Sequence, residues 1–429
     1  MTDAPSARQP MRILIGCDTF APDLNGAASF SKRLGVGLAR RGHEVHVMAP
    51  AQPHATGTFA EVYDGQTLTV HRIHSWRWPP HPWFRFMLPF TAKAHATKVI
   101  DSIHPDVVHF QSHFVIGFGL APVSKARGIR LVGTNHTMPE NLVQHATIVP
   151  KPALDWLTRA QWRSARRIFG MADAITSPTE KSGEYFVRMT GLRDVIAISN
   201  GIDTSVYTPD FSRQPDNRIV YVGRLDEEKH IDELIQAAAR IDPQLDVQVD
   251  IIGGGEMKQK LRDLAASLGV SDRIHFLGKL SDEELRATLT RGTIFAMPSR
   301  AELQCIAAME AMATALPVVG ANAMALPHLV HEGENGHLYE PGDIDGFAAA
   351  LTDVLTADPE RLKGMKEASL EVVTHHAMSH TLDVFEALYR GEPVTEPVIE
   401  PESASAAEWP RHGRHGRGAV AQPVRARDS

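Results

Sequence analysis

Short runs rich in β-branched residues alternate with longer amphipathic runs along most of the chain. The first half has strand-like runs at 12–17, 44–49, 106–110, 130–134 and 174–177, with a helix-like run at 29–41. The same rhythm begins again at 218–222 and continues through 247–252, 273–277, 293–297 and 317–319. This alternation is typical of βαβ units with parallel strands. We therefore predict an α/β protein with two doubly wound, Rossmann-like domains.

The boundary between the domains is predicted near residue 200. A turn-rich segment at 199–203 precedes a stretch rich in Pro and Asp at 209–216, and such stretches commonly join domains. We assign residues 11–200 to the first domain and 201–376 to the second. Three helix-like runs follow the last predicted strand, at 345–355, 359–375 and 379–390.

Both ends of the chain fall outside this pattern. Residues 1–10 have no apolar run, so we expect a disordered start without a secretory signal. Residues 391–429 are rich in Pro, Ala, Arg and Gly, and we expect a disordered tail. The longest uncharged stretch, 311–327, is interrupted by Pro and Gly, so no membrane-spanning helix is predicted.

The composition excludes some classes of binding partner. The 44 Lys and Arg against 51 Asp and Glu give a net charge of -7, which argues against a nucleic-acid partner. The two cysteines, Cys17 and Cys305, lie in unlike segments and do not indicate a disulfide framework. We therefore expect a cytoplasmic protein.

Ligands of doubly wound sheets bind at the carboxyl ends of the strands, so the residues after each strand are the first candidates. After 218–222, Arg224 and Lys229 would place two cations where a pyrophosphate could bind. A solvated charged turn, with Arg224 paired to Asp226 or Glu227, is the alternative.

A glycine turn follows the strand-like run at 247–252. Gly254 is the middle of three consecutive glycines that open a helix-like run at 257–268. A glycine turn at a helix amino end can bind an anion or a nucleotide, although a simple chain reversal explains it equally well. No strand-linked G-x-G-x-x-G occurs, which argues against a nicotinamide dehydrogenase.

The segment 298–313 is the most informative. Glu302 falls in a loop after a strand, and Glu310 falls in the following helix. Because a carboxylate can accept two hydrogen bonds from a vicinal diol, one Glu could bind a hexose and the other a ribose. The free amides at the helix start would face the sugar or phosphate, and they belong to Leu303, Gln304, Cys305 and Ile306. By spacing alone, both carboxylates could be surface residues.

In this combination the chain resembles glycosyltransferase family 4. The second domain of that family carries a G-R…K segment, an E-x7-E segment, E-A-M-A and P-V-V, and this chain has them at 223–229, 302–310, 310–313 and 317–319. The resemblance extends over about residues 11–390. It implies the GT-B fold, in which two Rossmann-like domains face each other across a cleft and the last helix, here 377–390, returns to the first domain.

The resemblance also implies roles for individual residues. Arg224 and Lys229 would hold the donor diphosphate, Glu302 the transferred sugar and Glu310 the nucleotide ribose. Gly26 would bring backbone amides to the phosphates from the first domain. His136 matches the catalytic histidine near the reacting sugar, although an isolated histidine after a strand is more often structural.

The chain departs from the family at one place. Many members have Gly-Phe-Gly after the first Glu of the motif, where this chain has Leu303, Gln304 and Cys305. Members that act on lipid acceptors often carry a polar residue at the Gln304 position. The departure therefore leaves the family assignment intact and puts the shape of the donor pocket in question.

The family transfers a sugar with retention of anomeric configuration and without a metal or other cofactor. The same would hold here, with Arg224 and Lys229 stabilising the leaving diphosphate. The lone Asp343-Ile344-Asp345 resembles a metal motif but is better explained as a helix start. His109 and His113 are interpreted as structural or acceptor-cleft residues, because no third zinc ligand is evident.

The sequence gives little information about the acceptor substrate. An aromatic and basic stretch at 76–87 and a second at 151–167 suit either a membrane interface or a partly buried surface. We expect a hexose, from GDP-mannose first and UDP-glucose or UDP-N-acetylglucosamine next, to reach a lipid-linked or polyol acceptor. A lipid acceptor would bring peripheral contact with the anionic inner face of a membrane. The alternatives are a sugar-nucleotide epimerase, a pyridoxal-dependent glucan phosphorylase and a non-catalytic nucleotide-sugar binding protein.

Overall fold

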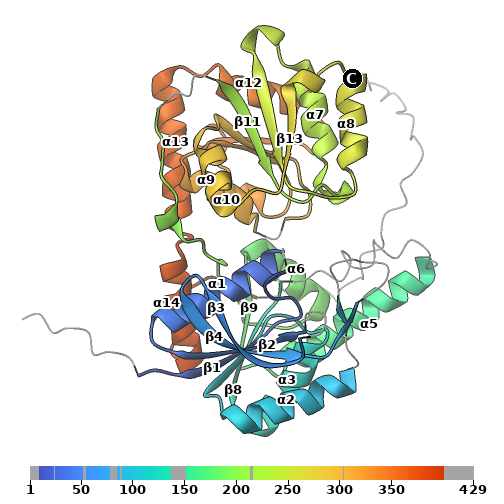
Figure 1. The fold of residues 1–429 in the computed structure, drawn as a ribbon, viewed down its shortest axis with the longest axis vertical. Coiled ribbons are helices and arrows are strands. Elements are labelled where there is room, and N and C mark those ends of the chain that lie inside the picture. The colour runs from blue at the N-terminus through green and yellow to red at the C-terminus, as the bar shows by residue number, and fades with distance from the viewer. Residues whose placement is uncertain are drawn as a thin grey trace, which may run out of the picture.

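Two α/β domains are stacked along the long axis of the molecule in the computed structural model (Figure 1). The structure describes residues 9–23, 25–51, 55–77, 85–86, 89–136, 151–212, 216–302 and 304–400. In these segments the two predicted doubly wound domains are confirmed, and each has its own sheet and hydrophobic core.

The first domain contains a nine-stranded sheet in the order β17-β10-β9-β8-β7-β1-β2-β4-β3. Its strands are β1 (Arg12–Gly16), β2 (Glu44–Pro50), β3 (Gly57–Tyr63), β4 (Gln66–Ile73), β7 (Val107–Phe110), β8 (Arg130–Thr134), β9 (Ala174–Ser177), β10 (Val195–Ala197) and β17 (Val398–Ile399). All neighbours pair in parallel except β3 with β4 and β10 with β17. A separate ribbon pairs β5 (Trp76–Arg77) with β6 (Arg85–Phe86).

Helices cover both faces of the first sheet. They are α1 (Gly26–Arg40), α2 (Pro89–Ile103), α3 (Ile116–Ala126), α5 (Lys151–Phe169) and α6 (Glu180–Thr190). The helix α6 begins in a capping box formed by Thr179 and Ser182, which satisfies amides that the helix itself leaves unpaired. Figure 1 shows one end of α5 extending away from the body of the domain.

The second domain contains a six-stranded parallel sheet in the order β13-β12-β11-β14-β15-β16. Its strands are β11 (Asn217–Val222), β12 (Val247–Ile252), β13 (Ile274–Gly278), β14 (Ile294–Met297), β15 (Val318–Ala321) and β16 (Gly336–Tyr339). Its α-helices are α7 (Ile231–Arg240), α8 (Lys258–Ser267), α9 (Asp282–Thr290), α10 (Ile306–Ala313), α11 (Leu326–Leu329), α12 (Ile344–Leu355) and α13 (Pro359–Thr374). Short 3-10 turns occupy Thr204–Val206, Glu227–Lys229, Pro243–Leu245 and Ser271–Arg273.

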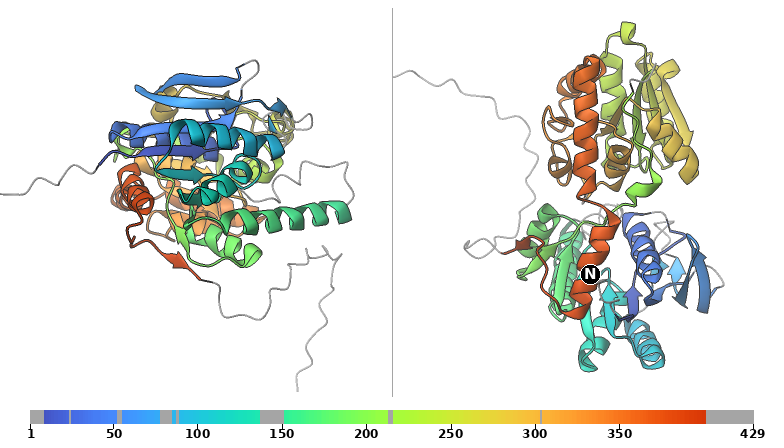
Figure 2. Two further views of the ribbon diagram at one scale, coloured as in Figure 1. Left: turned by 90° about the horizontal axis from the view of Figure 1, so that it is seen from below. Right: turned by 90° about the vertical axis from the view of Figure 1, so that its left-hand side faces the viewer.

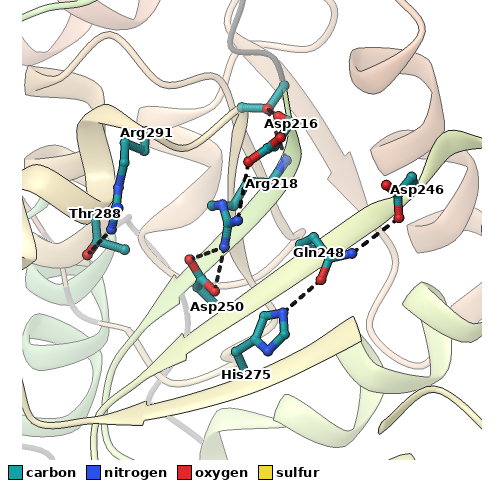
Figure 3. A network of polar contacts seen from close by, with 9 residues as sticks. Asp216, Arg218, Asp246, Gln248, Asp250, His275, Thr288 and Arg291 are labelled. Carbon is teal, nitrogen blue, oxygen red and sulfur yellow. Dashed lines mark hydrogen bonds and ion pairs between the residues drawn. The ribbon is translucent and has the colours of Figure 1, made fainter. Parts of the chain in front are cut away.

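Buried charge in the second sheet is paired within the sheet, as Figure 3 shows. Asp250 of β12 is almost fully buried, and Arg218 of β11 donates to both of its carboxylate oxygens, at 2.9 and 2.8 Å. His275 and Gln248 form a second contact, with 2.7 Å between His275 Nε2 and Gln248 Oε1. These side chains satisfy one another and stabilise the sheet.

The chain crosses between the domains twice, and the crossings lie side by side. Ile202 of the first crossing donates its amide to His376 O of the second, and the Met378 amide donates to Ile202 O, both at 2.9 Å. The last helix, α14 (Met378–Arg390), then packs on the first domain beside α1, as Figure 2 shows in its right-hand view. Gly37 of α1 permits this contact, because a Cβ there would lie 2.6 Å from Leu382 of α14.

Two features correct the sequence analysis. Part of the tail that we expected to be disordered from 391 onward is ordered, because Val398 and Ile399 form β17 and pair with β10. Ile399 is buried and fills the space beside Gly183 of α6. Residues 1–8 and 401–429 lie outside the described residues. The second feature is the antiparallel pair β3 and β4, which extends the sheet by two strands that the pattern of parallel units did not predict.

Candidate active site

The loop after β11 carries the two predicted phosphate-binding cations. Arg224 is 41% exposed and pairs with Asp226 and Glu228, where its Nη2 donates to Glu228 Oε1 at 2.6 Å. The alternative that we left open, a pairing of Arg224 with Asp226, therefore occurs in the structure. Because the side chain is partly exposed and its partners are on its own loop, it can exchange a carboxylate for a phosphate at low cost.

Lys229 reaches the predicted sugar-binding carboxylate. Its Nζ lies 2.7 Å from Glu302 Oε1 and 3.6 Å from Glu228 Oε1. Burial opposes the charge on the lysine, but the two carboxylates outweigh it and raise the pKa of Lys229. Burial likewise opposes the charge on Glu302, but Lys229 outweighs it and lowers the pKa of that carboxyl. Both groups are therefore ionised at neutral pH.

Glu310 lies on α10 and faces the first domain. Arg33 of α1 places its Nη1 4.0 Å from Glu310 Oε1, and the Tyr207 hydroxyl donates to the same carboxylate. Burial raises the pKa of Glu310, while Arg33 and Tyr207 reduce this shift. The carboxylate that we predicted to bind the ribose is thus held at the boundary between the domains. Sequence reasoning did not identify Arg33, although it lies seven residues, or two helical turns, beyond Gly26 on the same face of α1.

The loop between β14 and α10 carries the backbone amides that we proposed as ligand donors. Within the described part of the chain, the amides of Gln304, Cys305 and Ile306 donate to no acceptor. Cys305 has a φ of 57° and leads directly into α10. Leu303 lies outside the described residues. The side chain of Gln304 is directed elsewhere, since its Oε1 accepts from the Asn200 amide at 2.9 Å.

The glycine turn after β12 lies against the loop that carries Arg224. A Cβ on Gly253 would lie 1.8 Å from Gly223 O, and one on Gly255 would lie 2.4 Å from Leu225 O. These two glycines are therefore required by close packing of the two loops. Gly254 has more room, with Lys279 Cε as the near neighbour of a Cβ at 3.9 Å, and it remains a prediction as a donor contact.

Gly26 is the first residue of α1, the helix from which Arg33 reaches Glu310 of the second domain. A Cβ at Gly26 would have no neighbour within 4 Å in the described structure, so packing within the protein does not require glycine here. Asn25 caps the helix by accepting from the Ala28 amide at 2.9 Å. The position is compatible with the predicted approach of a ligand to the helix amino end.

His136 follows β8, is half-buried and belongs to an uncharged cluster. Its Nε2 lies 2.7 Å from Gln111 Oε1, and its ring packs against Phe30 with centroids 4.9 Å apart. Burial lowers the pKa of His136 to about 3. In this environment the ring is a neutral imidazole at physiological pH.

The other two histidines of this region are fully buried, and the His113 ring packs beside Phe114 with centroids 4.2 Å apart. His109 Nδ1 lies 2.7 Å from the Tyr389 hydroxyl, and its Nε2 lies 2.6 Å from Thr134 Oγ1. Burial lowers the pKa of His109 to about 3 and that of His113 to about 4. Asp343 caps α12 by accepting from the Gly346 amide, as expected for a helix start. Among the described residues, no three His, Cys, Asp or Glu side chains form a cluster that could hold a metal ion.

The predicted acceptor surface is described only in part. Trp76 is 43% exposed, whereas residues 78–84, 87 and 88 lie outside the described residues. On α5, Trp156 is 66% exposed. A groove of about 360 Å³ between α5 and α6 is lined by Arg159, Trp162, Arg163, Arg166, Met189 and Thr190. None of the helices in the described structure is long and apolar enough to span a bilayer.

Both domains match models of known protein families. The first domain matches the model for "Glycosyltransferase Family 4" over residues 24–206, and the second matches "Glycosyl transferases group 1" over residues 209–371. Together the two matches span both domains of the described structure.

Curated relatives and solved structures agree with these matches. The chain is 28% identical over 355 residues to a GDP-mannose-dependent alpha-mannosyltransferase of Mycolicibacterium smegmatis, covering 81% of this chain and 88% of the relative. It is 29% identical over 394 residues to a D-inositol 3-phosphate glycosyltransferase of the same organism, covering 86% of each. The fold matches sucrose-phosphate synthase from Thermosynechococcus elongatus with a TM-score of 0.71 at 20% identity, over 89% of this chain and 99% of that one. Anabaena HepE in complex with UDP gives 0.69 at 18% identity, over 89% and 100%.

Proposed function

Because the chain belongs to glycosyltransferase family 4, with the GT-B fold, we propose that it transfers mannose from GDP-mannose to a lipid-linked or polyol acceptor. Transfer from a sugar nucleotide is the activity of the family and is supported by the relatives on both domains. The choice of GDP-mannose is supported by two relatives named as GDP-mannose-dependent alpha-mannosyltransferases, which cover 81% and 90% of this chain.

The observation that carries the proposal is the buried pair of Lys229 and Glu302 beside Arg224. These groups lie after the carboxyl ends of β11 and β14, where doubly wound sheets bind ligands. The lysine and arginine supply positive charge for a diphosphate, and the carboxylate can accept from sugar hydroxyls. The free amides at the start of α10 supply further donors to the same place.

We propose retention of configuration, with the leaving diphosphate accepting the acceptor proton on the same face of the sugar. Arg224 and Lys229 would stabilise the charge that develops on that diphosphate. Gly26 would contribute the amide at the start of α1, and Glu310 would accept from the ribose hydroxyls. His136, being neutral, would contribute as a hydrogen-bonding group near the sugar and not as a cation.

For the acceptor, the exposed Trp156 and the arginine-lined groove of α5 support a lipid-linked molecule at an anionic membrane surface. Arginine side chains attract phosphate headgroups, and an exposed indole ring partitions into the interface. A soluble polyol phosphate would use the same attraction between arginine and phosphate without the membrane.

The test has two stages. A thermal-shift panel of GDP-mannose, UDP-glucose, UDP-N-acetylglucosamine and the free nucleotides should identify the donor, because a ligand that binds only the folded protein raises Tm. Transfer of labelled mannose to membrane lipid extracts and to inositol phosphates, with and without EDTA, then identifies the acceptor. We expect GDP-mannose to give the largest shift and EDTA to have no effect. An epimerised sugar nucleotide without transfer, or binding without turnover, would replace the proposal by the epimerase or the binding protein.

A further inference from the structure

The side chain of Gln304 connects the donor-side loop to the first crossing between the domains. Gln304 is 3% exposed. Its Oε1 accepts from the Asn200 amide at 2.9 Å, and its Nε2 donates to Ser199 Oγ at 2.5 Å. These contacts join positions more than 100 residues apart in the chain. They use both the acceptor and the donor of the amide group.

Ser199 is also held by the second crossing. His376 Nδ1 lies 2.9 Å from Ser199 Oγ, and Thr381 Oγ1 donates to Ser199 O at 3.0 Å. The donor-side loop, the first crossing and the second crossing therefore meet at this one serine. Any rotation of one domain relative to the other must pass through these crossings, because they are the only covalent connections in the described chain.

The same loop carries the predicted catalytic carboxylate two residues earlier. The loop is attached on its other side by Glu302 O, which accepts from the Ala325 amide at 3.1 Å. Gln304 supplies the attachment on the side of the crossings. With both attachments present, the carboxylate of Glu302 and the free amides of 304–306 are held in one position relative to the hinge.

We propose that Gln304 is a positioning residue that couples the placement of Glu302 to the hinge between the domains. This rests on the proposed sugar transfer, for which Glu302 contacts the hexose. Gln304 does not touch the donor with its side chain; it fixes the loop that does. The glutamine is suited to this task because it offers a carbonyl to the Asn200 amide and an N–H to Ser199 at the same time. Leucine has a similar volume and offers neither.

The test compares three variants with the unmodified full chain. Gln304→Leu removes both hydrogen bonds from the side chain to the first crossing, and Ser199→Ala removes one of them together with the His376 contact. Thr381→Val is the matched control. It removes the threonine hydroxyl that donates to Ser199 O, and it leaves the contacts of the donor-side loop in place. For each protein, kcat and KM are measured with the donor that the thermal-shift panel identifies, and GDP affinity is measured by calorimetry.

Hydrogen exchange of the peptide that contains residues 299–306 provides a readout that needs no substrate. We expect Gln304→Leu to speed this exchange and to lower kcat by about ten- to a hundredfold, with GDP affinity within about threefold, because a small displacement of a catalytic group is costly. Ser199→Ala should show the same changes to a smaller degree. In the double variant the peptide at 299–306 should exchange no faster than in Gln304→Leu alone, because Gln304→Leu already removes the contact between this loop and Ser199; the additional loss of the His376 contact falls on the crossings.

The proposal is overturned if the peptide at 299–306 exchanges equally in Gln304→Leu and in the unmodified chain, or if Thr381→Val lowers kcat as much as Gln304→Leu. The second result would mean that any loosening of the hinge has this effect. If Gln304→Leu does not fold, Ser199→Ala decides by the same two readouts. Absence of turnover in the unmodified chain would refute the proposed function alone, because the exchange experiment still tests the coupling.

Discussion

The two domains handle buried polar groups in different ways. On the first domain, His109, His113 and His136 are neutral, and burial lowers the pKa of each to about 3 or 4. On the second domain, Lys229 and Glu302 are both charged and stabilise each other. Two domains with the same βαβ architecture therefore bury different kinds of polar group: neutral imidazoles in the first and an ion pair in the second.

The difference follows from what each face would hold. A diphosphate needs fixed positive charge, and a carboxylate must be ready to accept from sugar hydroxyls. Such charges can be buried only as pairs, because a single buried charge is costly. An acceptor hydroxyl needs only hydrogen-bonding groups, which neutral imidazoles and amides provide. We therefore expect substitution, pH and truncation to change the activity and stability of the two domains differently.

The largest effect is expected from breaking the ion pair on the donor side. Glu302→Gln should lower transfer by about a hundred- to a thousandfold, because it removes a charge from the site of reaction. It should also destabilise the protein by about 1–3 kcal/mol, since Lys229 would keep only the more distant Glu228, 3.6 Å away, as a counter-charge. Urea unfolding and transfer assays measure the two effects separately. Combining the change with Lys229→Met should recover stability and not activity, and near-normal turnover of Glu302→Gln would refute the role of this carboxylate.

The next effect concerns acid, and it should fall on the first domain. A histidine whose folded pKa is about 3 or 4, below its unfolded value near 6.5, stabilises the protein above pH 6.5, and this stability is lost as the pH falls toward 4. We expect hydrogen exchange between pH 6.5 and 4.5, corrected for intrinsic rates, to show lost protection in β7 and β8 before β11 and β12. Equal loss of protection in both sheets would contradict the expected difference between the two domains.

A smaller effect is expected from removing the end of the chain. Deleting residues 392–429 removes β17 and uncovers the edge of β10, which should destabilise the first domain by about 1–3 kcal/mol. GDP affinity should stay within about twofold, because the donor-side loops are untouched. Deletion of 401–429 alone is the matched control and should leave the stability unchanged. A large loss of GDP binding in the shorter chain would show that the two faces are not independent.

The smallest effect should appear at the contact that joins the two faces. Arg33 reduces the upward shift of the Glu310 pKa, so Arg33→Gln should raise that pKa further. Glu310 would then be protonated at less acidic pH, and GDP affinity should begin to fall at a higher pH than in the unmodified chain, by a few-fold. Calorimetry across pH measures this, with Lys32→Gln on the same helix as the control. An identical pH dependence in both variants would exclude a role for Arg33.

The fold was accessible from sequence because it depends on local pattern, whereas the site residues were proposed from motifs that resemble those of a family. The strands β8, β9 and β12 have the bounds that their apolar runs predicted, and Asp343 begins a helix as its spacing indicated. The short β17 has two residues, and such a run has no periodicity to detect. The pair of β3 and β4 was missed because its exposed, mixed-polarity strand does not follow the parallel pattern.

The contacts among the site residues were not accessible in this way. Glu302 and Lys229 are 73 positions apart, and Gln304 and Ser199 are 105 positions apart. Spacing along the chain shows which residues follow strands, but it does not show which of them meet after the loops have packed. For this reason, the sequence indicated a doubtful donor pocket at Gln304, where the structure has a tether to the crossing between the domains.

The final segments of the chain complete the domain that is made first. The helix α14 covers the sheet of the first domain, and β17 closes its edge at β10. During synthesis, residues 12–197 emerge long before either segment has been translated. The first domain therefore exposes an apolar surface and an unpaired strand edge until the second domain has been made. Cotranslational folding should therefore proceed out of order, and protection of that surface by a chaperone would matter most in this interval.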